Sequence, residues 1–161
     1  MSATSLTSAR PIDPHGLYRA LVLEHARSPR NFGLLEHATH RAEGINPLCG
    51  DKLELTLAVD AAGCISNASF EGTGCAVSVA SASILTEAVT GLRVDEARAL
   101  FAQFQALLDD RPDAAAAGLA EPLLALAGVR QFPSRIKCAT LAWHAMASAT
   151  EDRGKAPVTT E

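Results

Sequence analysis

Residues 52 to 60 alternate between polar and apolar side chains, and this stretch constrains the fold more than any other part of the chain. Leu53, Leu55 and Leu57 fall on one side of an extended segment, with charged or hydroxylated residues on the other. A period of two is typical of a strand with one buried face. Turn residues 61–63 and the stretch 64–70 then predict an antiparallel hairpin.

The later part of the chain has the spacing of helices. Asp13-Pro14 is a typical helix start, with Asp as N-cap and Pro at the first helical position, and Pro29 ends this helix. Further helices are expected over 75–90, 95–108, 121–127 and 133–149. Residues 30–50 read mainly as loop, with room for one short strand. Early strands and late helices predict an α+β fold, a small antiparallel sheet of about three strands packed against several helices.

A chain of 161 residues fits one domain with a sizeable core. We expect this domain over residues 13–149, with an alanine-rich insertion at about 101–122. A loose N-terminal arm over 1–12 and a flexible tail over 150–161 complete the expected organisation.

Charge and hydropathy exclude several classes of protein. Fourteen basic and eighteen acidic residues give a net charge of −4, too small to indicate a nucleic-acid or membrane partner. No apolar run resembles a signal-peptide core or approaches the roughly 18 residues of a membrane helix. We therefore expect a cytoplasmic protein with reduced thiols. Four cysteines in that compartment indicate metal binding or sulfur chemistry rather than disulfides.

Two of the cysteines stand beside glycines. Cys49 and Asp51 flank Gly50, whose freedom allows a thiolate and a carboxylate to face one ion, although a plain turn also recruits Gly and Asp. Cys75 follows Gly72-Thr73-Gly74, which is expected to break the preceding strand, and it stands at the expected start of a helix. Backbone N–H groups favour a thiolate there, although burial as a small apolar residue is the alternative.

The other two cysteines differ from each other in their surroundings. Cys138 is expected in the first turn of the last helix, where Arg135 and Lys137 would lower the pKa of its thiol unless both are simply solvated charges. Cys64 lies in a strand with no glycine or helix start nearby, and we interpret it as a small packing residue.

The separations between these motifs match no zinc-finger spacing, so the interpretation depends on the donor types. Three thiolates and one carboxylate suit a tetrahedral, borderline-soft ion such as zinc. The four candidate ligands are Cys49, Asp51, Cys75 and Cys138. The five histidines are interpreted as surface or core residues.

At these residues the chain resembles the U-type iron–sulfur cluster assembly proteins, the NifU N-terminal and IscU-like family, and it looks most like the SufU branch. The resemblance spans about Leu17 to Met146. The matching segments are LYRALVLEHARSPRNFG at 17–33, NPLCGD at 46–51, EGTGCAVSVASASILTEAVTG at 71–91 and SRIKCATLAW at 134–143. The resemblance implies that the four candidate ligands hold a zinc ion, or alternatively iron or a [2Fe–2S] cluster.

The resemblance also implies a sulfurtransferase-like role. Cys49 matches the residue that accepts persulfide sulfur from a SufS-type cysteine desulfurase, and Arg135 matches a basic residue important for work with that partner. Downstream iron–sulfur assembly proteins are the other partners that the resemblance implies.

Scaffold-type relatives differ from this chain in three places. They carry a histidine where this chain has Lys137, an LPPVK motif where it has VRQFP at 129–133, and a shorter stretch between Cys75 and Cys138. These differences favour sulfur transfer over the alternative, a scaffold that assembles a [2Fe–2S] cluster on the same ligands. A closed, purely structural zinc domain is a third possibility.

Overall fold

The sheet has three long strands and one short strand in the order β3-β2-β1-β4. Strands β1 (His40–Asn46), β2 (Asp51–Val59) and β3 (Ile65–Thr73) pair antiparallel, whereas β4 (Val158–Thr159) pairs with β1 in parallel. The structure is a computed structural model that describes residues 14–109, 118–151 and 157–160. The α+β expectation is confirmed, and the sheet has a fourth strand that the sequence did not indicate.

The alternation along β2 matches one face of the sheet. Leu53, Leu55 and Leu57 are buried, as expected. Thr56 points to the other face but is buried as well, because the segment before β1 lies against it. The Leu35 N–H donates to Thr56 Oγ1 at 3.2 Å. Both faces of β2 are therefore covered at this point.

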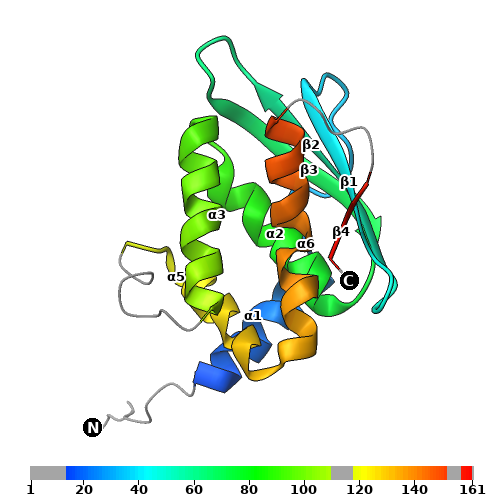
Figure 1. Cartoon of the computed structure of the whole chain (residues 1–161), viewed down its shortest axis with the longest axis vertical. Helices are drawn as coiled ribbons and strands as arrows, with labels where there is room; N and C mark the ends of the chain where they lie inside the picture. Colours follow the sequence, from blue (N-terminus) through cyan, green and yellow to red (C-terminus); the bar gives the residue numbers. More distant parts are fainter. Residues whose placement is uncertain (1–13, 110–117, 152–156, 161) are drawn as a thin grey trace, which may run out of the picture.

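Five helices and one short 3₁₀ helix complete the described part of the chain. Their bounds are α1 (Pro14–Arg27), α2 (Ala76–Val89), α3 (Val94–Leu108), α5 (Glu121–Leu126), η2 (Ala127–Gln131) and α6 (Pro133–Thr150). Each α-helix lies within one residue of its expected range. Helices α2 and α6 pack on the sheet, α1 packs on α2, and α3 packs on α6 (Figure 1). Among the described residues, no helix has the length and apolar character that crossing a bilayer requires.

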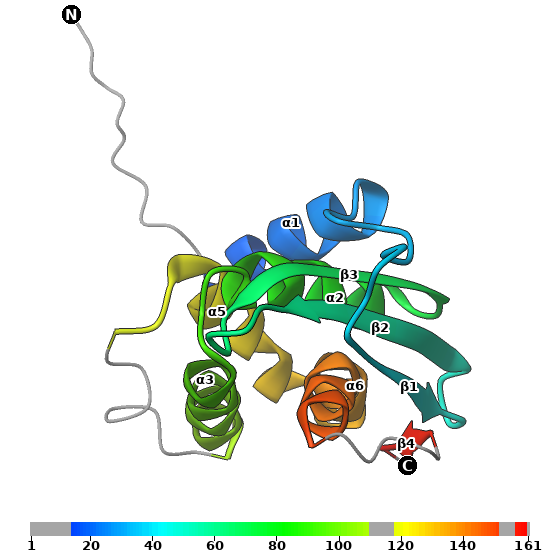
Figure 2. The same cartoon turned by 90° about the horizontal axis from the view of Figure 1, so that it is seen from above.

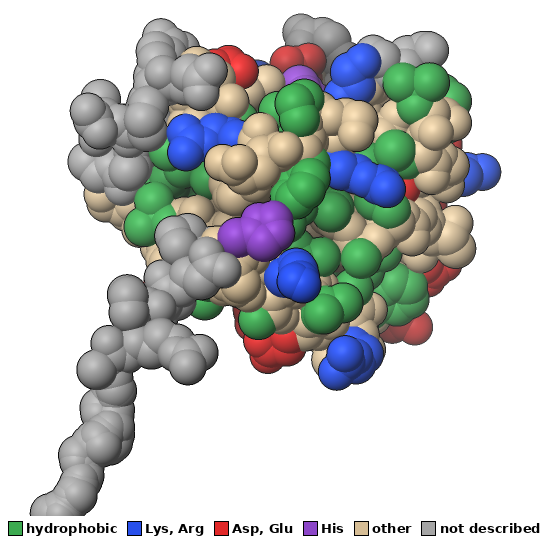
Figure 3. All heavy atoms as spheres, turned by 90° about the horizontal axis from the view of Figure 1, so that it is seen from below, with side chains coloured by type: hydrophobic (Ala, Val, Ile, Leu, Met, Phe, Trp, Pro, Cys, Tyr) green, Lys and Arg blue, Asp and Glu red, His purple; other side chains and the backbone are tan. Residues whose placement is uncertain are grey.

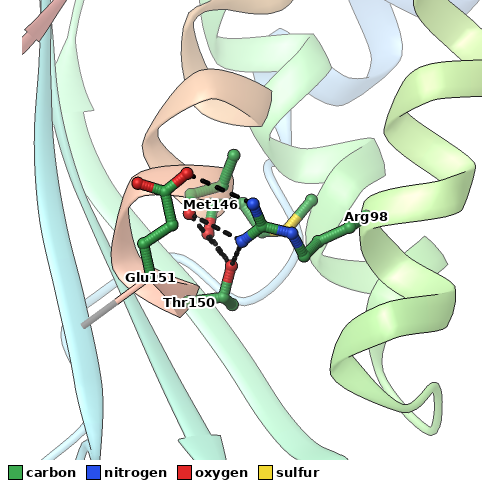
Figure 4. A network of polar contacts seen from close by, with 5 residues as sticks. Arg98, Met146, Thr150 and Glu151 are labelled. Carbon is green, nitrogen blue, oxygen red and sulfur yellow. Dashed lines mark hydrogen bonds and ion pairs between the residues drawn. The ribbon is translucent and has the colours of Figure 1, made fainter. Parts of the chain in front are cut away.

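The contact between α3 and α6 combines aromatic packing with a polar network. Trp143 of α6 is fully buried and lies 5.3 Å from Phe104 and 5.9 Å from Phe101, measured between ring centroids. Arg98 of α3 donates to Thr150 Oγ1 at 2.7 Å and forms an ion pair with Glu151 at 3.2 Å (Figure 4). These contacts hold α3 against the C-terminal half of α6.

Strand β3 ends before Cys75, as expected, but it runs beyond Phe70 and includes the first of the two glycines that precede α2. Strand β3 continues to Thr73, with Gly72 opposite Leu53. A Cβ on Gly72 would lie 2.2 Å from the carbonyl oxygen of Lys52. Glycine therefore permits a close approach of two paired strands here instead of breaking the ladder.

The end of the chain also differs from the expected flexible tail. Val158 and Thr159 form β4, and the Thr160 N–H donates to the carbonyl oxygen of Ile45 at 3.2 Å. Thr160 Oγ1 donates to the carbonyl oxygen of Lys137 at 3.2 Å, so the segment contacts both β1 and α6 (Figure 2). An open edge of β1 supplied the unpaired backbone groups that make this pairing favourable. The expected N-terminal arm over 1–12 and residues 110–117 of the expected 101–122 insertion lie outside the described residues.

Candidate metal centre

Three chain segments meet at one end of the molecule: the tip of the β1–β2 hairpin, the start of α2 and the start of α6 (Figure 1). Each carries at least one of the candidate ligands expected from the sequence. Elements far apart in the chain therefore bring their polar ends together on a rigid base of sheet and helices.

The hairpin tip carries Cys49 and Asp51. Asn46 and Asp51 form the last pair of the β1–β2 ladder, and a four-residue turn, 47–50, connects them. The Cys49 N–H donates to the carbonyl oxygen of Asn46 at 3.3 Å, and Gly50 has φ +70°. The left-handed backbone at Gly50 turns the chain sharply, so that the Cys49 side chain lies beside that of Asp51.

Asp51 connects the hairpin to the N-terminus of α2. Its side chain is buried, and Oδ1 accepts a hydrogen bond from the Cys75 N–H at 2.8 Å. A Cβ on Gly74 would lie 2.6 Å from that same Oδ1, so only glycine allows the carboxylate this position. The carboxylate thus binds a free N–H at the positive end of a helix.

The side chains of the candidate ligands form one cluster. One ligand atom from each of Cys49, Asp51 and Cys138 lies within 4.8 Å of the other two. Cys75 borders this group, with its Sγ 4.0 Å from Asp51 Oδ2. Cys64 precedes the nine-residue β3 and Cys75 follows it, so roughly 30 Å of strand separates them.

The environment of Cys138 differs from the expectation. It is the sixth residue of α6, in the second turn and not the first, and it is fully buried. Burial, together with contacts to Cys49 and Asp51, raises the pKa of the Cys138 thiol well above its usual range. The expected lowering by flanking cations is therefore wrong for the metal-free site, because removal from water outweighs charges at the surface.

Arg135 lies on the solvent side of the cluster. Its Nη1 lies 3.8 Å from the Sγ of Cys49, and the neighbouring cysteine sulfurs, Cys138 first, raise its pKa. Lys137 is exposed and one residue before Cys138. The Arg135 guanidinium therefore lies beside Cys49, the cysteine on the β1–β2 turn.

The comparisons with known proteins agree with this arrangement. A family described as the NifU-like N-terminal domain matches residues 17–153, a span that contains the whole cluster. The chain belongs to this family.

Two curated relatives of this NifU-like domain carry different names. The zinc-dependent sulfurtransferase SufU of Bacillus subtilis (strain 168) is 38% identical over 130 residues, which cover 81% of this chain and 86% of that protein. The iron–sulfur cluster assembly scaffold protein IscU of Streptococcus pyogenes serotype M1 is 41% identical over 133 residues, covering 83% and 82%. Identity alone therefore does not separate the two roles.

A solved structure is similar over the same length. It is a candidate iron–sulfur cluster assembly scaffold protein for the SUF system of Fervidobacterium islandicum AW-1, with a TM-score of 0.74 and 28% identity. The match covers 84% of this NifU-like domain and 97% of that chain. The resemblance to U-type assembly proteins noted in the sequence is confirmed.

The donor atoms of this NifU-like domain fit a zinc ion. Tetrahedral zinc with bonds of about 2.0–2.3 Å keeps its ligand atoms roughly 3.3–3.8 Å apart. The ligand atoms of Cys49, Asp51 and Cys138, within 4.8 Å of one another, need only a small contraction to reach that spacing. Cys75 lies outside this group of three, with its Sγ 4.0 Å from Asp51 Oδ2.

Sequence reasoning did not single out two residues that contact or border this cluster. Asn46 is fully buried and donates to both Asp51 and Cys138. Tyr18 is buried, and its pKa is raised first by burial and then by the nearby Cys75. Asn46 begins the NPLCGD segment that carries two of the candidate ligands, and this position was the sequence signal that could have identified it. The structure pairs it with Asp51 across the four-residue turn.

Proposed function

We propose that this NifU-like protein serves iron–sulfur cluster assembly as a zinc-dependent sulfur acceptor, with Cys49 as the accepting residue. The proposed metal ligands are Cys49, Asp51, Cys75 and Cys138. The observation that carries the proposal is the unequal anchoring of these residues. Cys49 stands on a turn at the surface, whereas Asp51 and Cys138 are buried and accept hydrogen bonds from the Asn46 side chain.

The anchoring differs in its hydrogen bonds and its burial. Asp51 is 1% exposed and accepts bonds from the Cys75 N–H and from Asn46, at 2.8 and 3.2 Å. Cys138 is 0% exposed in the second turn of α6. Cys49 and Cys75 are both half-buried, but Cys75 stands at the start of α2, whereas Cys49 stands on the turn, where Leu48 beside it is 74% exposed. A partner can therefore reach Cys49 while Asp51 and Cys138 stay in place.

The chemistry is thiolate attack on a persulfide. The Cys49 thiolate attacks the outer sulfur of a cysteine persulfide on the partner; a new S–S bond forms at Cys49, and the partner's S–S bond breaks. The partner's cysteine leaves as a thiolate, and the proton stays on the transferred sulfur, so charge and electrons balance. A bound zinc ion would keep the cluster thiols deprotonated and protect them while idle. Arg135, 3.8 Å from Cys49 Sγ, stabilises the negative charge before attack.

The proposed partner is a SufS-type cysteine desulfurase in the cytoplasm. The end of the molecule at which α6 begins carries apolar and basic side chains mixed together (Figure 3). Leu48, which precedes Cys49 in the chain, is exposed, and so is Phe132, which lies shortly before Arg135. Arg135 itself lies beside Cys49. An apolar surface with basic groups fits a partner surface with apolar and acidic side chains.

The second candidate function is a scaffold that assembles a [2Fe–2S] cluster on the same residues. The 41% identity to a protein named as an IscU scaffold favours it. Cysteine-rich sites bind iron–sulfur clusters as well as zinc, so the donor set does not decide between them. Transfer kinetics separate the two roles, because a scaffold takes up iron together with sulfide and a sulfur acceptor does not require iron.

The test is the turnover of a SufS-type desulfurase with and without this protein. Wild type is expected to stimulate turnover and to acquire one labile sulfur in the absence of iron. Cys49→Ser is expected to abolish both effects. Cys64→Ser, at the end of β3 away from the cluster, is expected to retain both. Undiminished stimulation by Cys49→Ser would sink the proposal. A wild-type protein that leaves turnover unchanged but forms a [2Fe–2S] chromophore with iron and sulfide would establish the scaffold role instead.

A further inference from the structure

Asn46 lies directly beneath the candidate metal ligands. It is the last residue of β1, it pairs with Asp51, and it is 0% exposed. Its Nδ2 donates to Asp51 Oδ2 at 3.2 Å and to Cys138 Sγ at 3.5 Å. One amide group therefore joins a residue of the hairpin to a residue of α6, 92 positions away from Asn46 in the chain.

The orientation of this amide follows from its partners. A carboxylate accepts hydrogen bonds only, so the nitrogen of Asn46 must face Asp51 and the oxygen must face away. Within the described part of the chain, Asn46 Oδ1 is the one buried side-chain oxygen or nitrogen without a hydrogen-bond partner. A buried, unpaired acceptor costs about 1–3 kcal/mol. The unpaired Oδ1 of Asn46 therefore destabilises the fold, and the hydrogen bonds that Nδ2 donates to Asp51 and Cys138 compensate for this loss.

The two contacts act on atoms that would bind the metal. An N–H donor pointed at a carboxylate or thiolate favours the charged form and restricts its rotation. Outer contacts of this kind orient metal ligands, and their removal typically weakens metal binding by about 10–100-fold. The Asn46 side chain donates no hydrogen bond to Cys49. The side chain that faces the Cys49 sulfur from outside the cluster is that of Arg135.

We propose that Asn46 is a positioning residue for the metal centre, which holds Asp51 and Cys138 in the geometry for zinc and leaves Cys49 as the exchangeable ligand. This inference rests on the proposed function, because it assumes that the four-residue cluster binds zinc. It goes further by assigning a separate task to a residue that is neither a proposed metal ligand nor the proposed sulfur acceptor.

A purely structural role for Asn46 predicts something different. Asn46→Leu keeps the number and branching of the side-chain heavy atoms, removes the unpaired Oδ1 and removes both donors. If Asn46 only closed the hairpin, the substitution would reduce the free energy of zinc binding by no more than it reduces the free energy of unfolding. If it positions the ligands, zinc affinity falls while the fold of the loaded protein is retained.

The test uses the whole chain loaded with zinc or with cobalt(II). Zinc affinity is measured by competition with a chelator, and the sulfur-to-cobalt charge-transfer band reports the bond to cysteine. We expect Asn46→Leu to bind zinc about 10–100-fold more weakly and to shift the cobalt band. Thr56→Val is the matched control: it removes a buried polar group of the neighbouring β2, which bonds Ser69 at 2.7 Å, and is expected to change neither reading.

The outcomes separate the two proposals. If wild type binds zinc and Asn46→Leu matches it in affinity and spectrum, the positioning role is wrong and the proposed function stands. If Thr56→Val weakens zinc binding as much as Asn46→Leu does, the effect is one of general stability and the positioning role is again wrong. If wild type itself binds no zinc, the proposed function fails together with this extension of it.

Discussion

Gly74→Ala tests the contact between the hairpin and α2, because a single methyl group would meet Asp51 there. The added Cβ would lie 2.6 Å from Asp51 Oδ1 and 3.1 Å from the Asp51 Cα. Gly74 is not among the residues with positive φ, so alanine can adopt its backbone conformation without strain. The clash with Asp51 therefore decides the result.

The size of the effect follows from the distances. An ordinary C···O contact needs about 3.3 Å, so the carboxylate must move by roughly 0.7 Å, away from the Cys75 N–H. The 2.8 Å bond between that N–H and Oδ1 would then be lost or weakened. A hydrogen bond to a charged group contributes about 1.5–3 kcal/mol. Replacing glycine returns about 0.4–1 kcal/mol through the unfolded state, which leaves a net loss of roughly 0.5–2.5 kcal/mol.

The assay compares unfolding in urea with zinc affinity. Gly74→Ala is expected to lower the free energy of unfolding by roughly 0.5–2.5 kcal/mol and to weaken zinc binding about 10–100-fold, because a displaced Asp51 is a poorer ligand. Gly63→Ala is the control: Gly63 has φ +84° and nothing within 4 Å of its added Cβ, so it destabilises through backbone strain alone. Zinc affinity that stays at the wild-type value in Gly74→Ala would refute the assigned position of Asp51.

The remaining predictions concern the core. Burial first, and then Arg30, lower the pKa of His25, which is bonded to Ser83 at 2.7 Å. Unfolded histidine takes up a proton below about pH 6.5 and the folded side chain does so only at lower pH, so this contribution to stability is present above about pH 6.5 and declines as the pH falls. His25→Gln should therefore show a shallower loss of stability between pH 7.5 and 5 in urea unfolding, with burial of His144 leaving a residual slope; equal slopes would contradict this. Trp143→Phe removes an indole N–H that donates to Ser81 Oγ at 3.1 Å and leaves a small cavity, so we expect a loss of roughly 2–3 kcal/mol by circular dichroism, and a loss below about 0.5 kcal/mol would show that the site repacks freely.

The sequence by itself determined the helices, the β2–β3 hairpin and the identity of the candidate ligands. Apolar spacing, proline and glycine act on their immediate neighbours, so the bounds of α1, α2, α3, α5 and α6 follow from local chemistry to within one residue. Cysteines beside Gly50 and Gly74, with a carboxylate two residues after the first of them, already indicate a candidate site. These inferences need no knowledge of which segments touch.

Only the tertiary structure decided the relations between distant segments. It buried both faces of β2 at Thr56 and paired the end of the chain with β1. It also buried Cys138, which reversed the expected direction of its pKa shift. The physical reason is the same in each case: burial and hydrogen bonding depend on what arrives from elsewhere in the chain, and Asn46 meets Cys138 across 92 residues that no local pattern connects.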